Sequence, residues 1–337
     1  DVTVPGGARL GTAGVTFVTV LPTHRRRGIL RRLMRRIIDG AHESGEPLAA
    51  LTASEATIYG RFGFGQAVPM VEWRLDSTRA EWRSDAPGGR IELVDRSEAR
   101  GVVPALHDAA CARPGMFARS EFLWDVYELE DESWMRNGHS ERRIGIYHGA
   151  SGPEGYVFFR TKLGGRGSVL VTEMHALTGD AYRALVGFTA GVDLTQRVRF
   201  QRRSTDEPMR WMLADSRAVR RIEGEYMWFA LVDLRAGLEA RTYEADGRVV
   251  LDVTDSFCPW NQGRWLLEVD AGRAACSPTD ADPDVSLPVS ELAALFMGGR
   301  SALPMVAAGR IEASPENAVQ LDAMFRTRVP PWSLEYF

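Results

Sequence analysis

The stretch VTVLPTHRRRGIL, residues 18–30, predicts a strand, a basic turn and the start of a helix, in that order. Residues 14–20 alternate and are rich in β-branched side chains, which is typical of a strand, and Pro22 ends it. Thr23 is a suitable N-cap for the helix that follows. Over residues 29–38, pairs of apolar residues alternate with pairs of arginines. This pattern predicts a helix with one buried stripe and one basic stripe.

The start of the predicted helix is a candidate site for a pyrophosphate group. Backbone N–H groups at a helix N-terminus have no partner within the helix and lie at the positive end of its dipole. Gly28 has no Cβ, so a ligand can approach its backbone closely. Arg25, Arg26 and Arg27 add positive charge that suits phosphate. The alternative is an ordinary amphipathic helix whose arginines face solvent.

A second segment, ASEATIYGRFGF at residues 53–64, supplies a candidate acid. It follows a short apolar strand at residues 47–53, and a further strand is predicted at residues 68–75. Tyr59 stands at the end of the short helix between them. A phenol, with a reference pKa of ~10, keeps its proton at neutral pH and can donate it to a leaving group. The alternative is a tyrosine that only packs against the neighbouring phenylalanines.

Together these segments resemble the acyl-CoA-binding half of the GNAT acetyltransferase superfamily, and within it the Eis-type aminoglycoside and lysine N-acetyltransferases. The superfamily turn reads Gln/Arg-x-x-Gly-x-Gly/Ala, and residues 25–30 follow it except at Leu30. Residues 282–299, DPDVSLPVSELAALFMGG, look like the sterol-carrier-like third domain of that family. The last residues, PPWSLEYF at 330–337, are similar to the family's aromatic C-terminus, which enters the active site.

The resemblance implies a mixed α/β (α+β) fold with three domains, which agrees with a chain of 337 residues. Residues 1–80 would form the C-terminal part of a GNAT domain, and residues 84–225 a second GNAT-like domain. Residues 226–337 would form a sterol-carrier-like domain whose tail enters the active site. Between two predicted strands of the second domain, residues 163–168 are expected to form a hairpin loop. The second domain is therefore expected not to bind acyl-CoA.

By the same resemblance, the protein is an N-acetyltransferase that uses acetyl-CoA as co-substrate and needs no metal. Tyr59 would act as general acid, and the α-carboxylate of Phe337 would assist deprotonation of the amine. With a reference pKa of ~3.3–3.7, this carboxylate needs burial or a water relay to take that proton. The residues expected to bind acetyl-CoA are Val18, Thr19, Val20, Arg25, Arg26, Arg27, Gly28, Ile29, Leu30, Ser54 and Glu55.

The expected acceptors are polycationic amines such as aminoglycosides. Phe17 either lines the acceptor pocket or belongs to the core, and Glu335 either binds the acceptor or is a solvated charge. Family members often carry an acidic residue directly before the terminal Phe, whereas this chain has Tyr336 there. Other amines, including lysine side chains, polyamines and arylamines, are the second hypothesis. A non-catalytic acyl-CoA-binding or lipid-binding module is the third.

Composition restricts the partners and the compartment. The 41 basic and 45 acidic residues give a net charge of −4, which disfavours nucleic acid and membrane surfaces. No run approaches the ~20 apolar residues of a membrane span. The scattered Cys111, Cys258 and Cys276 predict reduced thiols in a bacterial cytoplasm. The sequence begins at Asp1, without the family's opening strand and helices, so secretion stays open. The resemblance implies a homo-oligomer, a hexamer in the family.

Overall fold

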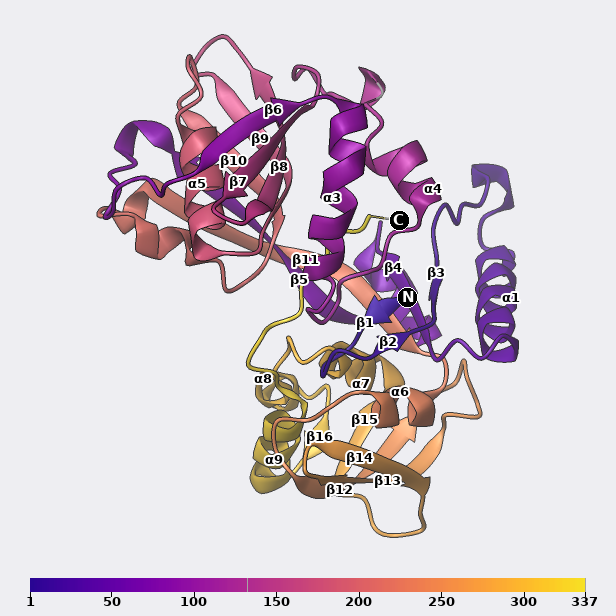
Figure 1. Cartoon of the computed structure of the whole chain (residues 1–337). Coiled ribbons are helices and arrows are strands. Elements are labelled where there is room, and N and C mark those ends of the chain that lie inside the picture. Colours follow the sequence, from indigo (N-terminus) through magenta and orange to yellow (C-terminus); the bar gives the residue numbers. More distant parts are fainter. Residues whose placement is uncertain (132, 337) are drawn as a thin grey trace. The chain divides into compact units, whose positions relative to one another are not determined.

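The computed structural model describes residues 1–131 and 133–336, and these form two compact units (Figure 1). Unit 1 comprises Asp1–Pro69, Arg113–Phe117 and Glu225–Phe337, and its described part ends at Tyr336. Unit 2 comprises Met70–Ala112 and Ala118–Gly224. The three-domain boundaries expected from the sequence stay a prediction.

The first part of unit 1 is built on two parallel strands joined by a helix. Strand β3 (Thr12–Gly14) pairs with β4 (Leu48–Thr52), and α1 (Ile29–Glu43) connects them. On its other side, β4 pairs antiparallel with the last residues of β11 (Val219–Leu231). The helix buries Met34 and Ile38 in an apolar cluster, while its arginine-rich stripe stays outside that cluster. The predicted two-striped helix is therefore confirmed.

A short connection follows β4 and carries the candidate acid. Helix α2 (Ala56–Tyr59) leads directly into a 3-10 turn at Gly60–Phe62, and β5 (Gly65–Asp76) begins after it. At the start of the chain, β1 (Val2–Thr3) and β2 (Arg9–Leu10) form a small antiparallel pair.

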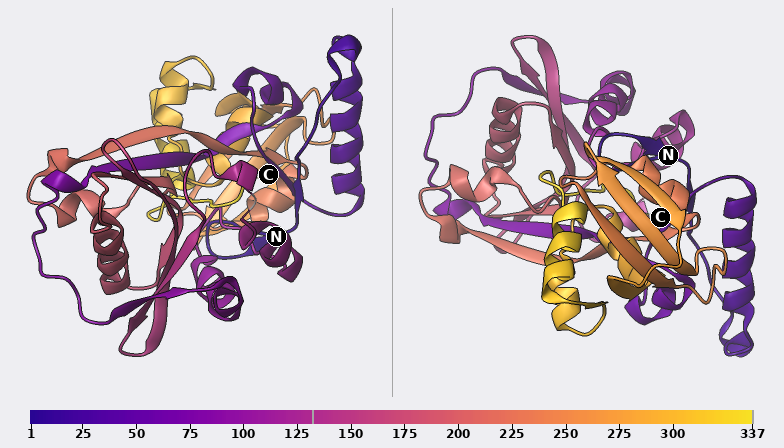
Figure 2. Two further views of the ribbon diagram at one scale, coloured as in Figure 1. Left: turned by 90° about the horizontal axis from the view of Figure 1, so that it is seen from above. Right: turned by 90° about the horizontal axis from the view of Figure 1, so that it is seen from below.

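The last part of unit 1 is a separate five-stranded sheet with order β14-β13-β12-β15-β16, seen in two further views in Figure 2. Its only parallel pair among the described strands is β12 with β15. The strands are β12 (Gly247–Thr254), β13 (Gly263–Asp270), β14 (Arg273–Pro278), β15 (Val285–Pro288) and β16 (Glu312–Ala313). The helices are α6 (Leu234–Ala240), α7 (Val289–Phe296), α8 (Ala302–Ala307) and α9 (Pro315–Phe325).

Buried Arg241 ties two of these helices together at their C-terminal ends. Its guanidinium donates to the carbonyl of Phe296, at the end of α7, and to that of Phe325, at the end of α9, at 2.8 Å. Burial lowers the pKa of Arg241 to about 10, so the side chain still carries its charge at neutral pH. A cation at the negative end of two helix dipoles, bonded to their last carbonyls, is stabilising.

Unit 2 contains a sheet with order β5-β10-β9-β8-β7-β6, helices on both faces and short irregular elements between them. Its strands are β6 (Arg90–Val94), β7 (Arg143–Gly149), β8 (Gly152–Lys162), β9 (Ser168–Ala176) and β10 (Arg197–Arg203), together with the later residues of β5. Its helices are α3 (Arg96–Ala110), α4 (Glu121–Leu123), which continues into a π-helical turn at Trp124–Glu128, and α5 (Gly179–Ala190). Within its described residues, unit 2 also has 3-10 turns at Ser77–Arg79, Ser133–Met135, Pro208–Met212 and Ser216–Ala218.

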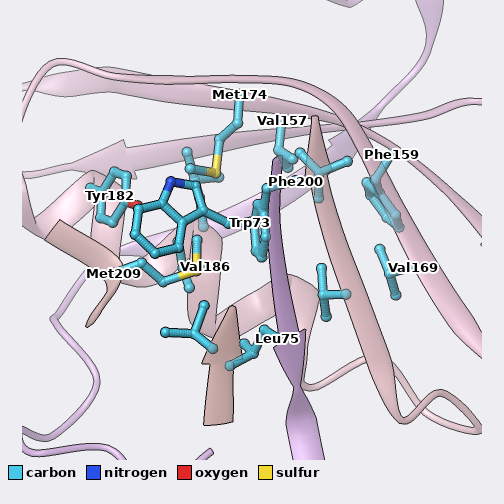
Figure 3. Close-up of a cluster of buried hydrophobic side chains, with 14 of the residues drawn as sticks. Trp73, Leu75, Val157, Phe159, Val169, Met174, Tyr182, Val186, Phe200 and Met209 are labelled. Atoms are coloured by element: carbon cyan, nitrogen blue, oxygen red, sulfur yellow. The ribbon is translucent and has the colours of Figure 1, made fainter. Parts of the chain in front are cut away.

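The alternation of side chains along β8 decides which helix covers which face. Val157 and Phe159 pack with Tyr182 of α5 in the cluster drawn in Figure 3. Their neighbours Tyr156 and Phe158 point to the other face, where they pack with α3. Successive strand residues face opposite sides of a sheet, so both faces of this sheet are covered.

The structure corrects the predicted strand and helix start around the basic turn. The strand expected at residues 14–20 ends at Gly14, because Phe17 has a φ of 53° that no extended strand accommodates. The helix begins at Ile29, and its N-cap is Gly28 rather than Thr23. Thr23 lies instead in a 3-10 turn at Pro22–His24.

Other local predictions are confirmed. The apolar strand at residues 47–53 is β4, the strand at residues 68–75 lies within β5, and residues 163–167 form the hairpin loop between antiparallel β8 and β9. Within residues 1–131 and 133–336, no helix has the length and apolar character that a membrane crossing requires.

The three cysteines are buried, which predicts inert thiols. Burial raises the pKa of the Cys258 thiol to about 12 and that of Cys276 also to about 12. The thiolate is the reactive form. We expect DTNB at about pH 8 to leave the native thiols unmodified and to titrate all three after denaturation. A native thiol that reacts as fast as free glutathione would contradict this burial.

Candidate functional site

Directly after β3 the chain separates from β4. Among the described residues, the end of β4 therefore has no neighbouring strand on that side. Val15 still donates its N–H to the carbonyl of Ala50 at 2.9 Å. Residues 16–21 then pair with no strand in the part of the chain that the structure describes, whereas β4 continues to Thr52. Within this stretch Val18 and Val20 are half-buried and Thr19 is exposed. Backbone groups here are placed to pair with the amides of an extended ligand.

The N-terminus of α1 presents unpaired donors to solvent. The first intrahelical hydrogen bond runs from the N–H of Arg32 to the carbonyl of Gly28 at 3.1 Å, and no side chain caps the helix. Gly28 has a φ of 73°, a left-handed conformation that favours glycine. The preceding Arg25, Arg26 and Arg27 are exposed, and the first turn contains no acidic residue. These features fit a pyrophosphate.

The corresponding helix of unit 2 lacks these features. Like α1, α5 joins two parallel strands, β9 and β10. Its first turn is capped by Thr178, whose hydroxyl accepts the N–H of Ala181 at 3.1 Å. The first turn also contains Asp180, which repels an anion. The anion-binding features are therefore concentrated in unit 1.

Tyr59 lies at the same edge of the sheet as the basic turn. Because β3 and β4 are parallel, the segments that follow them begin at the same edge, and Tyr59 comes shortly after β4. Its ring is 8% exposed and meets Phe64 edge-on at 6.1 Å between ring centroids. No described residue forms a hydrogen bond with the Tyr59 hydroxyl. Exposed Ser54 and Glu55 lie between β4 and α2.

The C-terminal tail is docked rather than frayed. Residues 331–335 are buried, and the N–H of Trp332 donates to the carbonyl of Pro114 at 2.8 Å. Arg113 Nε donates to the carbonyl of Pro330 at 2.9 Å. Gly115, with a φ of 87°, is needed here because a Cβ would lie 2.8 Å from the carbonyl oxygen of Trp332. Residues 113–115 therefore form the surface against which the C-terminal tail packs.

The tail runs towards the end of β4. The hydroxyl of Tyr226 donates to the carbonyl of Glu335. The residue after Tyr226, Met227, pairs with Thr52 at the end of β4. The described tail therefore ends close to the strand that leads to Tyr59. Phe337, the predicted source of the carboxylate, lies outside the described residues.

Two alternatives for the acceptor residues are wrong. Phe17 is 88% exposed, so it is not a core residue. Glu335 is only 6% exposed, so it is not a solvated charge. Their roles in acceptor binding stay predictions. Sequence reasoning missed Arg113 and Tyr226, which hold the tail. The Pro114-Gly115 pair signals a turn there, but no local pattern connects it to the C-terminus.

Family models match three parts of the chain. Two models described as acetyltransferase (GNAT) domains match residues 1–67 and 115–235. A sterol carrier protein domain matches residues 234–334.

Relatives and solved structures match over nearly the whole chain. An uncharacterized N-acetyltransferase of Streptomyces avermitilis is 38% identical, over 98% of this chain and 83% of that protein. The N-acetyltransferase Eis of Mycobacterium tuberculosis is 35% identical, over 97% of this chain and 81% of that protein. The crystal structure of Eis1 from Mycobacterium abscessus superposes with a TM-score of 0.88 and 32% identity, covering 100% of this chain and 85% of that one.

Proposed function

Because the chain belongs to the Eis family of GNAT N-acetyltransferases, we propose that it acetylates amines of polycationic acceptors such as aminoglycosides. Its mixed α/β fold contains two GNAT domains and a C-terminal SCP2-type domain. The GNAT family implies acetyl-CoA as the acetyl donor. The observation that carries the proposal is the placement of the uncapped, arginine-flanked N-terminus of α1 and of Tyr59 at one edge of the sheet.

Each part of the donor site has a distinct task in this proposal. The backbone of residues 18–20 pairs with the amides of the pantetheine arm. The turn from Arg25 to Leu30 holds the pyrophosphate through N–H groups and guanidinium groups. Ser54 and Glu55 border the donor where β4 ends. Acetyl-CoA, when bound, supplies the acetyl thioester.

Transfer then needs two proton movements. The neutral amine of the acceptor forms a C–N bond to the acetyl carbon, and the C–S bond of the thioester breaks. The Tyr59 hydroxyl donates its proton to the departing sulfur. The α-carboxylate of Phe337 accepts the amine proton, directly or through a water molecule. Phe17 and Glu335 are the proposed acceptor contacts, Phe17 through its exposed ring.

The test is release of free thiol from acetyl-CoA with a panel of aminoglycosides, polyamines, arylamines and lysine peptides. Turnover with aminoglycosides supports the proposal. Turnover only with another amine class keeps the acetyltransferase and moves the acceptor to that class. Binding of acetyl-CoA without turnover on any amine would favour a non-catalytic acyl-CoA-binding module. The native mass, by light scattering, tests the hexamer implied by the family.

Deleting Phe337 tests the role of the terminal carboxylate. The deletion moves the carboxylate one residue back, so we expect kcat to fall by about 100-fold or more, as for loss of a general base. Phe337→Ala is the matched control, because it removes the ring and keeps the carboxylate in place. Steady-state kinetics on both variants separate the two groups. A deletion variant with wild-type kcat would discard the base assignment and leave the acetyltransferase intact.

A further inference from the structure

The loop between β12 and β13, residues 255–262, contacts α1 along its length. Arg35, on the basic stripe of α1, donates from Nη2 to the carbonyl of Phe257. The Arg35 guanidinium carbon lies 4.0 Å from the centroid of the Phe257 ring, which is a cation–π contact. Near the end of the helix, His42 stacks on Trp260 with 4.3 Å between ring centroids. Figures 1 and 2 show this loop beside α1.

Phe257 also contacts the turn that carries the proposed acid. Its ring is 1% exposed and meets Phe62 edge-on, with 5.0 Å between centroids and 64° between planes. Phe62 ends the 3-10 turn that follows Tyr59 directly. Phe257, Tyr59 and Met34 of α1 belong to one buried cluster. A single side chain of the SCP2-type domain thus touches both halves of the proposed site.

The loop is held rigidly by its own buried polar groups. The carboxylate of Asp255 accepts the N–H of Phe257 at 2.9 Å and that of Cys258 at 2.8 Å. Asn261 donates to the carbonyl of Leu231 at 2.8 Å and accepts the N–H of Leu234 at 3.0 Å. These bonds fix the loop to the end of β11 and the start of α6. Buried polar groups whose hydrogen bonds are satisfied specify one geometry. A loop held in this way can fix the position of the elements that it contacts.

Two arginines of the basic stripe lie over the Phe257 ring, Arg35 at 4.0 Å and Arg31 at 5.5 Å from its centroid, and Arg35 also donates a hydrogen bond to the loop. Arg31, Arg32 and Arg36 are exposed, whereas Arg35 is half-buried and turned to the loop. Its guanidinium therefore contacts the C-terminal domain, and it also pairs with Asp39 of α1 at 3.3 Å. The neighbouring arginine, Arg36, has the same charge and lies on the same helix without any described bond to the loop.

We propose that the 255–262 loop positions the acetyl-CoA-binding helix and the Tyr59 turn, with Arg35 and Phe257 as positioning residues; this inference rests on the function proposed above. The loop fixes the axial position and the rotation of α1. It therefore also fixes the position of the backbone N–H donors at the N-terminus of this helix. Through Phe62 it also fixes the turn behind Tyr59. Through this loop, the SCP2-type domain contributes to acetyl transfer at a point where it does not itself contact the substrates.

Arg35→Met removes the hydrogen bond and the cation–π contact to the loop, together with the ion pair to Asp39. Arg36→Met is its matched control for charge and helix propensity. We expect Arg35→Met to weaken acetyl-CoA binding, measured by calorimetry, and to raise KM for acetyl-CoA, each by about tenfold, as for a small displacement of a binding element. KM for the acceptor should be unchanged. Arg36→Met should match the wild type in both. Arg35→Lys, which keeps the charge and a donor, should recover part of the affinity.

Phe257→Leu tests the second contact while keeping an apolar side chain in the core. It should lower kcat as well as acetyl-CoA affinity, because it touches the Tyr59 turn too. Melting temperatures, taken in parallel, ensure that the assays run on folded protein.

The outcomes separate the two proposals. Arg35→Met that melts earlier but binds acetyl-CoA like the wild type would overturn the positioning role and leave the enzyme assignment standing. Equal losses in Arg35→Met and Arg36→Met would also overturn it, because general loss of charge would explain both. A wild-type protein that does not bind acetyl-CoA would refute the proposed function itself.

Discussion

Tyr59→Phe is expected to lower kcat by about 100- to 10,000-fold, the usual contribution of a general acid. The substitution removes only the hydroxyl, and the ring can keep its edge contact with Phe64 in the buried cluster. Affinity for acetyl-CoA should persist, because the proposed donor contacts lie in the turn before α1 and in the strand edge. Steady-state thiol release and calorimetry with acetyl-CoA measure the two quantities separately.

A matched control removes a phenol elsewhere. Tyr147, on β7 in unit 2, donates its hydroxyl to the carbonyl of Gly88 at 2.7 Å. Tyr147→Phe should leave kcat unchanged. A Tyr59→Phe variant with wild-type kcat would assign the tyrosine to packing alone, and solvent or another group would then protonate the thiolate.

Glu173→Gln is expected to destabilise unit 2 by about 3–5 kcal/mol, as for a buried ion pair that loses one partner. Glu173 Oε1 and Oε2 accept from the two terminal nitrogens of Arg119 at 2.9 and 3.0 Å, and both side chains are almost fully buried. The hydroxyl of Tyr156 donates to Glu173 at 2.5 Å. The substitution leaves the Arg119 charge buried, with Glu128 Oε2 at 3.6 Å from Arg119 Nη2.

Denaturation by urea, followed by circular dichroism, measures this effect. Glu92→Gln is the matched control, because Glu92 pairs with Arg90 at 2.6 Å but both side chains are largely exposed. Loss of that pair should cost at most about 1 kcal/mol. Equal losses in the two variants would contradict a special role for the buried pair. Combining Arg119→Met with Glu173→Leu should recover much of the stability, since replacing both partners leaves neither of these two charges buried without the other.

The same pair predicts a pH dependence with a defined sign. Burial by itself raises the pKa of Glu173, but attraction to Arg119 and the hydrogen bonds from Arg119 outweigh it and hold this pKa well below its usual 4.5. A carboxyl group whose pKa is lower in the folded state stabilises the fold at pH values above its unfolded pKa. That contribution is lost as the pH falls below 4.5 towards the depressed value. Glu173→Gln should therefore lose less stability on acidification than the wild type.

Most local elements follow from periodicity and from turn residues. The pairs of apolar and arginine residues in α1 repeat with the helical period, and they specify its buried face without reference to a partner. The same holds for the apolar run of β4 and the capped start of α5 at Thr178. The sequence also singles out Gly28, because the absence of a Cβ lets a ligand approach its backbone. The structure adds that its backbone is left-handed.

The sequence-based predictions were wrong where a contact distant in sequence or a single dihedral angle determines the local structure. Residues 14–20 have strand composition, yet Phe17 turns the chain away from β4. β-propensity reflects packing on a neighbouring strand, which a local pattern does not contain. The late start of α1 has a similar origin, because the 3-10 turn at Pro22–His24 uses the residues that a local rule assigns to the cap.

The sequence by itself determined the family, the mixed α/β class, the two-striped helix, the glycine turn and the tyrosine that follows β4. Only the tertiary structure decided what those elements face. Arg35 and Phe257 are separated by 222 residues, and Arg119 and Glu173 by 54. The spacing of apolar residues along the chain indicates which side of an element is apolar. The local sequence around an arginine on a helix surface does not indicate which residue it will contact. Folding brings those groups together because burial and charge pairing are satisfied across the whole molecule at once.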